Sequence, residues 1–151
     1  MKRIVPILLL LAVNLPLCAR SYDWAVGIRG SYMNGSVAAK HFFNEKNALD
    51  LSASVYFKHT TFEVSAAYEW TFPIMEKLDF YVGPGLTAGN FHLGDVNRFS
   101  FGIEGIAGLE YNFGIPLAIF LDYRPRFNFV PGEKGVGFTY LDFGLGVKYR
   151  F

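Results

Sequence analysis

Residues Phe138–Phe151 read FTYLDFGLGVKYRF, and this stretch decides the fold. From Leu141 onward, every odd position carries an aliphatic or aromatic side chain, and every even position carries a small or charged one. Successive side chains of a strand point to opposite faces, so the stretch predicts a β-strand with one apolar and one polar face. Such a strand either covers a soluble core or presents its apolar face to lipid.

Length and composition narrow the class of protein. A chain of 151 residues suits a single domain, and 18% aromatic residues is a high share for a soluble one. After the first twenty residues, no apolar run approaches the ~20 residues of a membrane helix. The formal net charge of +1 gives no support to nucleic-acid binding. An aromatic-rich chain without such a run indicates membrane strands.

Residues 1–21 have the pattern of a secretory signal peptide. A positive start at Lys2 and Arg3 precedes an apolar run to Leu15 and a small-residue exit before Tyr22. We expect a mature domain of residues 22–151, with the exact cleavage site left open. The alternative is that these residues form a buried first helix. Cys18 is the only cysteine and would leave with the signal, so no disulfide is expected.

Eight alternating segments follow the signal, each near the 9–11 residues of a tilted membrane strand. They are Asp23–Met33, Ser36–Phe43, Ala48–Lys58, Thr61–Thr71, Leu78–Asn90, Phe99–Phe113, Leu117–Phe127 and Phe138–Phe151. Asn34-Gly35 predicts a tight hairpin, Phe72–Lys77 a turn, and His92–Arg98 a polar loop. Pro84 lies mid-strand and cannot donate a ladder hydrogen bond, so a β-bulge is predicted there. The order predicts an antiparallel meander in which the last strand pairs with the first.

The charged side chains of these segments share one face. They are Arg29, Lys40, Asp50, Lys58, Glu63, Glu69, Asp79, Glu104, Glu110, Asp122, Arg124, Asp142, Lys148 and Arg150. His41 is the polar exception on the opposite face. Alternation alone fits a soluble barrel as well, but the polar face is dense in Gly, Ala and Ser, as a narrow lumen requires. We therefore expect a lumen filled by paired charges, with a proton or ion path as the alternative.

Aromatic residues gather where the expected strands meet one end of the sheet. The expected interfacial girdle comprises Trp24, Phe43, Tyr68, Trp70, Phe80, Tyr111, Phe113, Tyr149 and Phe151. If the N-terminus starts on the periplasmic side, the descending strands end in this band, as expected of a girdle where the membrane of an outer-membrane barrel meets water.

The mature chain resembles the small eight-stranded outer-membrane barrels of the OmpX and OmpA-domain type. Leu145–Phe151 looks like the terminal signal read by the outer-membrane assembly machinery, and residues 40–49 (KHFFNEKNAL) look like a turn of one such subfamily. The resemblance implies an all-β, closed, antiparallel up-and-down transmembrane barrel. It also implies an integral location in the Gram-negative outer membrane, in contact with its lipid. We expect the barrel to be a monomer. It implies no chemistry, because the fold serves several roles.

Residues that carry chemistry are sparse. His41, His59 and His92 are widely spaced, without a metal-ligand or triad pattern. We expect no catalytic, cofactor-binding or metal site, and a structural or surface-interaction role. The alternatives are a lipid A-modifying enzyme of the same fold, for which His92 with Ser100 is the nearest candidate pair, and a narrow pore.

Overall fold

The computed structural model describes residues 22–58, 61–93, 96–131 and 136–151, so the expected signal peptide lies outside the described residues. Its strands are β1 (Trp24–Ser31), β2 (Asn34–Phe42), β3 (Asn47–Tyr56), β4 (Thr61–Met75), β5 (Leu78–Leu93), β6 (Val96–Asn112), β7 (Leu117–Tyr123), β8 (Arg126–Phe129), β9 (Val136–Thr139) and β10 (Phe143–Arg150). Within these ranges, no helix is long and apolar enough to cross a membrane.

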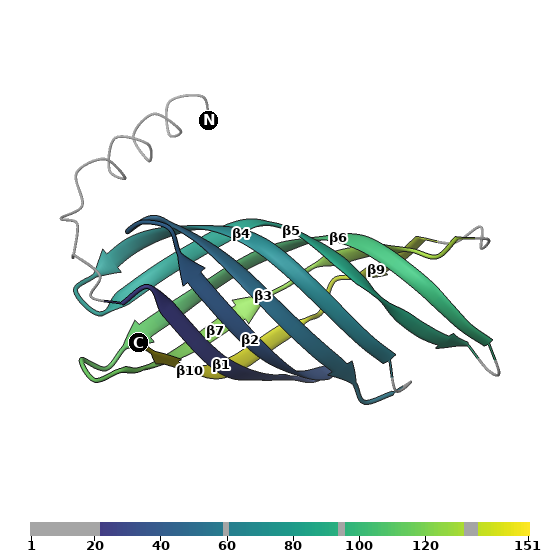
Figure 1. Cartoon of the computed structure of the whole chain (residues 1–151), viewed down its shortest axis with the longest axis horizontal. Helices are drawn as coiled ribbons and strands as arrows, with labels where there is room; N and C mark the ends of the chain where they lie inside the picture. Colours follow the sequence, from purple (N-terminus) through teal and green to yellow (C-terminus); the bar gives the residue numbers. More distant parts are fainter. Residues whose placement is uncertain (1–21, 59–60, 94–95, 132–135) are drawn as a thin grey trace, which may run out of the picture.

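Eight of these strands close into an antiparallel ring, which confirms the predicted barrel. β1 to β7 pair in sequence order, and β10 pairs with both β7 and β1 (Figure 1). β8 continues β7 against β6 without a change of register, since Tyr123 pairs with Ala107 and Arg126 with Glu104. β9 precedes β10 and pairs with β8. The barrel therefore has eight staves, of which the seventh is β7 with β8 and the eighth is β9 with β10.

The pairing register advances by ten residues around the ring. A row of paired residues leaves the seventh stave at Leu117 and returns to it at Phe127, ten residues further on (127 − 117). It passes through Tyr149, Val26, Ala39, Leu51, Ala66, Leu86 and Ile103. Eight strands with such a stagger enclose an interior just wide enough for side chains to fill.

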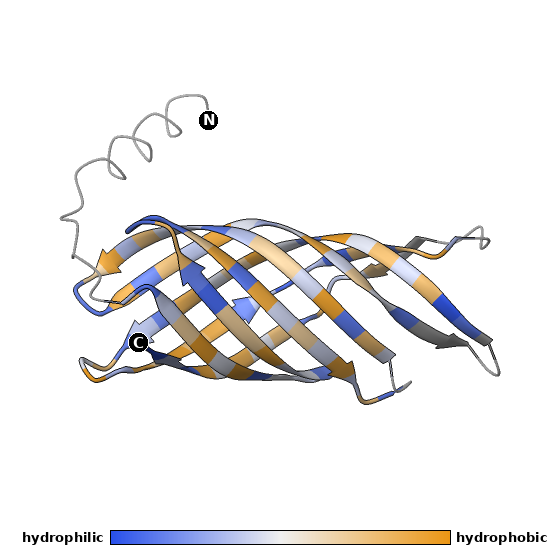
Figure 2. Ribbon diagram, viewed as in Figure 1, coloured by the Kyte–Doolittle hydropathy of each residue, from blue (hydrophilic) through white to orange (hydrophobic). Residues whose placement is uncertain are grey.

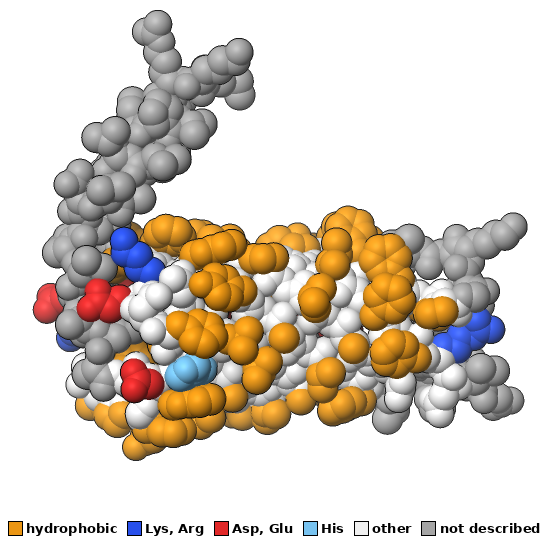
Figure 3. All heavy atoms as spheres, turned by 45° about the horizontal axis from the view of Figure 1, so that its top comes forward, with side chains coloured by type: hydrophobic (Ala, Val, Ile, Leu, Met, Phe, Trp, Pro, Cys, Tyr) orange, Lys and Arg blue, Asp and Glu red, His pale blue; other side chains and the backbone are white. Residues whose placement is uncertain are grey.

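The predicted alternation holds around the whole ring and has an inverted sense compared with a soluble protein. Leu145 is 63% exposed on the outside, whereas Lys148 on the same strand is 1% exposed inside. Hydrophilic and hydrophobic positions alternate along the strands (Figure 2). In Figure 3, hydrophobic side chains cover the visible side of the barrel, and charged ones gather at its two ends. We call the end near Trp24 and Phe151 the terminal end and the opposite one the distal end.

The predicted hairpin at Asn34-Gly35 is wrong. Both residues lie in β2, where Gly35 pairs with Gly30, and the turn falls two residues earlier. The Ser31 hydroxyl accepts hydrogen bonds from the backbone N–H groups of Met33 and Asn34, which satisfies the turn. The Asn34 side chain is then free to point inward, where it is fully buried.

Two other predicted turns are shorter than expected. β5 runs to Leu93 and β6 starts at Val96, so most of the predicted loop His92–Arg98 is strand. β4 likewise continues through most of the predicted turn Phe72–Lys77, because Pro73 still pairs with Asp79 and a bulge follows before Met75. Long hairpins arise because neighbouring strands keep pairing beyond the point where the apolar alternation fades.

The predicted β-bulge at Pro84 is also wrong. Ala67 pairs with Gly85 and Trp70 with Val82, so the β4–β5 register is the same on both sides of the proline. Pairs between these two bridges are missing, as expected beside a residue without an N–H group. Pro84 instead pairs with Gly105 on the β6 side. The absent N–H group of Pro84 is accommodated by a gap in the β4–β5 pairing, and no extra residue is inserted as a bulge would require.

Candidate functional site

The lumen holds the largest concentration of charge among the described residues. Seven carboxylates and five bases are buried there. They are Asp50, Glu63, Glu69, Glu104, Glu110, Asp122 and Asp142, with Arg29, Lys40, Arg124, Arg126 and Lys148. A buried charge is costly unless it is paired and hydrogen-bonded, so the pairing of these groups is the central question about the site.

In the distal half of the lumen, Arg126 is the hub. Its guanidinium forms ion pairs with Glu63 and Asp142, and lies 4.0 Å from a Glu104 oxygen. The Tyr56 hydroxyl contacts the same guanidinium and donates to Glu63 at 3.1 Å. These residues come from β3, β4, β6 and β8 and from the segment before β10, so one guanidinium joins most of the ring.

The middle of the lumen is held by two arginines that share one carboxylate. Arg29 contacts Asp142 at 2.9 Å and Asp122 at 2.7 Å. Arg124 approaches the other oxygen of Asp122 at 3.0 Å and also pairs with Asp50 at 3.3 Å. Both carboxylate oxygens of Asp122 are thus occupied by cations from different staves.

Two lysines form the terminal half of the cluster. Lys148 lies 3.9 Å from Asp50 and 3.4 Å from Glu110, and Lys40 lies 3.8 Å from Glu110 and 2.5 Å from Glu69. The ring of Tyr81 lies beside both ammonium groups, 4.4 Å from Lys40 Nζ and 5.3 Å from Lys148 Nζ. Cations gain from such contact with an aromatic face when water is absent.

These contacts join into one connected path with strictly alternating charge. From the distal to the terminal half it runs Glu63, Arg126, Asp142, Arg29, Asp122, Arg124, Asp50, Lys148, Glu110, Lys40 and Glu69. Each internal member of the path therefore has an opposite charge on both sides. We call this path the lumenal charge network, with Glu104 as a side branch.

The structure places eleven of the fourteen predicted lumenal residues in the buried interior. Asp79 and Arg150 are half-buried near the terminal end, where Asn112 donates to Asp79 at 3.0 Å and accepts from Arg150 at 2.7 Å. The prediction for Lys58 is wrong: β3 ends at Tyr56, and Lys58 is exposed in the turn beyond it.

Three important members of the lumen were absent from the predicted set. Arg126 has the same parity as Asp122 and Arg124, so the alternation itself could have identified it. Tyr81 has the same parity as Asp79 and so lies on the polar face, but it is aromatic, and only its contacts with two lysines show its role. Asn34, which bonds to Arg29 and Asp142, was hidden by its resemblance to a turn residue.

Known proteins with the same architecture are membrane barrels. Neisserial surface protein A aligns with a TM-score of 0.63 at 17% identity, covering 85% of this chain and 93% of that chain. The N-terminal β-barrel domain of Pseudomonas aeruginosa OprF gives 0.60 at 22% identity, covering 85% and 95%. A de novo designed transmembrane β-barrel gives 0.61 at 12%, covering 88% and 99%. No family model matches the sequence, and no curated protein matches it significantly.

The chain has the fold of the small outer-membrane β-barrels. Within this fold, the predicted girdle residues lie on the outer face, with Phe80 half-buried. Four of the outward side chains form a row of neighbouring rings that includes His41. Between ring centroids, Trp24 lies 4.3 Å from His41, His41 lies 5.2 Å from Phe43, and Phe43 lies 6.4 Å from Tyr68. The His41 ring is also hydrogen-bonded to the backbone: its Nδ1 lies 3.2 Å from the Asp23 carbonyl oxygen. Since a carbonyl oxygen can only accept, Nδ1 is the donor.

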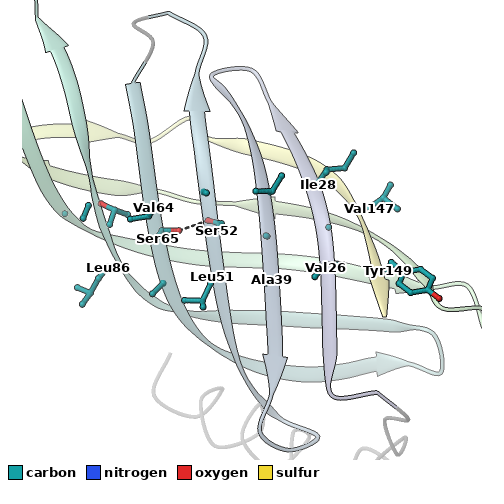
Figure 4. A pocket seen from close by; sticks show the side chains of 18 of the residues that line it. Val26, Ile28, Ala39, Leu51, Ser52, Val64, Ser65, Leu86, Val147 and Tyr149 are labelled. Carbon is teal, nitrogen blue, oxygen red and sulfur yellow. Dashed lines mark hydrogen bonds between the residues drawn. The ribbon is translucent and has the colours of Figure 1, made fainter. Parts of the chain in front are cut away.

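A hollow of about 1190 Å³ lies along the wall of the small barrel and is bordered by no carboxylate, lysine, arginine or histidine. Outward aliphatic residues such as Leu51 and Val64 line it, together with Ser52 and Ser65, whose hydroxyls point toward each other and bond at 2.7 Å (Figure 4). It meets the lumenal charge network at Ser52, whose hydroxyl accepts a hydrogen bond from Arg124 at 3.4 Å. Its lining residues include no acid or base.

The histidine predictions have different outcomes. His41 lies in the aromatic band, His59 falls outside the described residues, and so does the side chain of His92. Ser100 is buried and its hydroxyl donates to the Gly89 carbonyl at 3.4 Å. Within the described part of the chain, His, Cys, Asp and Glu side chains form no cluster of three suited to a metal ion. The suggested pairing of His92 with Ser100 stays a prediction.

Proposed function

We propose that this protein is an integral outer-membrane barrel with a structural or surface-interaction role and a closed lumen. The observation that carries the proposal is the inverted distribution of side chains. Twelve charged side chains are buried inside the ring, while large apolar ones such as Ile28 and Leu86 are about two-thirds exposed outside. In water this arrangement would expose the apolar surface and bury the charge, whereas in a bilayer the apolar surface meets lipid.

Two features support a closed lumen over a conducting one. The lumenal charge network occupies the interior with paired groups from both halves of the barrel. Toward the terminal end, Phe42 is buried with Ala25 and Ala48, and the Tyr22 ring packs edge-on against Phe42 at 5.2 Å. An interior filled by its own side chains serves as a core, and a water path would require some of these contacts to open.

The orientation and partners follow from the same proposal. The terminal end, with its aromatic band, faces the periplasm, and the distal hairpins face outward. The partners are outer-membrane lipid and, during biogenesis, the barrel assembly machinery. The barrel acts as a monomer and catalyses no reaction, since its buried charges are committed to one another.

Fractionation with heat-modifiable electrophoresis tests the proposal. The protein should be recovered with the outer membrane and should migrate differently in detergent gels before and after boiling, because closed barrels resist unfolding in detergent. A soluble periplasmic protein of similar size, followed in the same fractionation, serves as the control. Recovery of this protein in the soluble periplasmic fraction would contradict the proposal.

A further inference from the structure

The barrel is taller on one side than on the other. The β5–β6 hairpin and the paired strands β8 and β9 extend beyond the β1–β2 hairpin at the distal end (Figure 1). The register explains the difference. A row of paired residues climbs from Ile28 through Val37, Ala53, Val64, Ala88 and Phe101 to Phe129 in six steps.

The height of this climb can be estimated from the ten-residue advance over eight steps. Six steps correspond to about seven or eight residues of rise, while Tyr32 lies only four residues beyond Ile28 (32 − 28). Phe129 therefore stands roughly 9 Å further out along the barrel axis than Tyr32, at ~3.3 Å per residue and a tilt of ~40°. An upright barrel would lift this part of the wall well above the β1–β2 rim.

The outer face of this taller part is aromatic. Phe101 stacks on Phe129 at 5.7 Å, Phe127 on Phe138 at 4.2 Å, and Tyr140 lies 5.9 Å from Phe138. All five side chains are between 37% and 55% exposed. We call them the distal aromatic face. It continues directly from the apolar belt, because Tyr123 and Phe143 stack at 4.7 Å on the same two staves below it.

The inner side of the taller part remains polar. Ser100 and Asn128 are buried, and Thr87 donates to Asn128 at 3.3 Å. The wall here keeps the aromatic-out, polar-in alternation of the ring below. A hairpin built to stand in water would carry polar residues on its outer face. This part of the wall is therefore constructed like the membrane-embedded part.

We propose that the distal aromatic face contacts lipid acyl chains, so that the membrane boundary crosses the barrel obliquely, from the β1–β2 rim up to Phe129 and Phe138. The inference rests on the proposed membrane location. A bilayer adapts to a wall of uneven apolar height by tilting the protein or by thickening locally, at a modest cost per ångström. The distal aromatic face thus sets the tilt of the barrel in the membrane, with the shorter β1–β2 rim on the opposite side of the boundary's slope.

Site-directed spin labelling in phosphatidylcholine vesicles tests this inference. Residues 22–151 contain no cysteine, so Phe129→Cys, Phe138→Cys, Tyr32→Cys, Lys58→Cys and Val147→Cys each give one labelled site. We expect labels at Phe129 and Phe138 to relax several-fold faster with oxygen than with a water-soluble nickel chelate. These labels should lie at least as deep in the membrane as the label at Tyr32. Two positions are labelled because each substitution removes one ring stack, and one of the two variants could fail to fold for that reason alone.

The control positions separate the possible failures. Lys58 should report water and Val147 the acyl-chain region. Nickel access at Phe129 and Phe138 equal to that at Lys58, with Val147 still protected, would overturn the oblique boundary and leave the membrane location intact. Nickel access at Val147 as well would overturn the proposed function itself.

Discussion

Trp24 and Phe151 exchange two backbone hydrogen bonds. The Trp24 N–H donates to the Phe151 carbonyl at 3.1 Å, and the Phe151 N–H donates to the Trp24 carbonyl at 2.9 Å. The pair continues the β1–β10 ladder to the terminal end, where both side chains belong to the predicted girdle. Closure of the ring at this end thus depends on two residues from opposite ends of the described chain.

Phe151→Ala separates the role of this backbone pair from that of the aromatic ring. The substitution keeps both hydrogen bonds and removes a side chain that is 61% exposed. We expect the purified protein to refold in detergent with unfolding free energy changed by under about 1 kcal/mol. Its level in the outer membrane should fall several-fold, because the ring belongs to the proposed assembly signal. An unchanged level would remove Phe151 from that signal.

Asp142→Asn should be among the most destabilising isosteric changes in the lumen. Its carboxylate pairs with both Arg29 and Arg126 and accepts from Asn34. Removing the charge takes one carboxylate from each guanidinium and leaves Arg29 with Asp122 and Arg126 with Glu63. The remaining imbalance of buried charge should cost up to about 3–5 kcal/mol. Urea unfolding followed by tryptophan fluorescence measures the change. The control Glu45→Gln, in an exposed turn, should stay within about 0.5 kcal/mol; equal effects would contradict the assigned pairing.

Val147→Arg tests which face of the wall meets lipid. Val147 points outward from β10 and is 43% exposed. An arginine at the middle of the bilayer costs about 2–4 kcal/mol in a membrane barrel, and less near the interface. Unfolding from lipid vesicles should show this loss, while Val147→Leu should be nearly neutral. If arginine and leucine were tolerated equally, the outward assignment would be untenable.

Gly146→Ala tests how tightly the inner wall packs. A methyl group at Gly146 would lie 2.4 Å from the Ile28 carbonyl oxygen and 2.3 Å from Phe120 Cζ. Relief requires backbone or ring movement, which typically costs about 1–3 kcal/mol. Gly30→Ala is the matched control on the outer face, since a methyl group there meets nothing within 4 Å. Similar unfolding midpoints for the two variants would mean that the inner wall has spare room.

Planar-bilayer recordings test the closed lumen. Protein shown to be folded by heat-modifiable migration should give no stepwise conductance, because the lumenal charge network and the Phe42–Tyr22 contact fill the interior. Boiled protein from the same preparation controls for contaminating pores. Reproducible unitary steps from the folded sample alone would favour the pore alternative.

The fold could be predicted from the sequence because one period governs nearly the whole chain. The alternation around Leu145 and Lys148 identifies faces, and the same rule holds in each stave. Turns were harder, since Asn34 has the composition of a turn residue yet its side chain is used by Arg29 and Asp142. Local propensity gave way there to a contact with a residue 108 positions away.

The partners within the lumen could not be predicted from the same pattern. Arg29 and Asp122 are 93 positions apart, and their meeting depends on the stagger of all staves between them. The sequence pattern also does not predict that the last two staves are each divided into two strands, β7 with β8 and β9 with β10. Arg124 N–H donates to the Asp142 carbonyl at 2.9 Å at this level, and the register between the two staves then changes by one residue. A hydrophobic pattern carries no information about such a shift.

The closed ring with its ten-residue advance restricts which length changes the chain can accept. Inserting one residue into a stave would rotate every side chain beyond it by one face, so that a residue such as Lys148 would turn to lipid and Val147 to the lumen. Inserting two residues would preserve the facing and only lengthen a hairpin. Tolerated insertions and deletions within the staves should therefore come in even numbers, whereas the distal turns can vary freely.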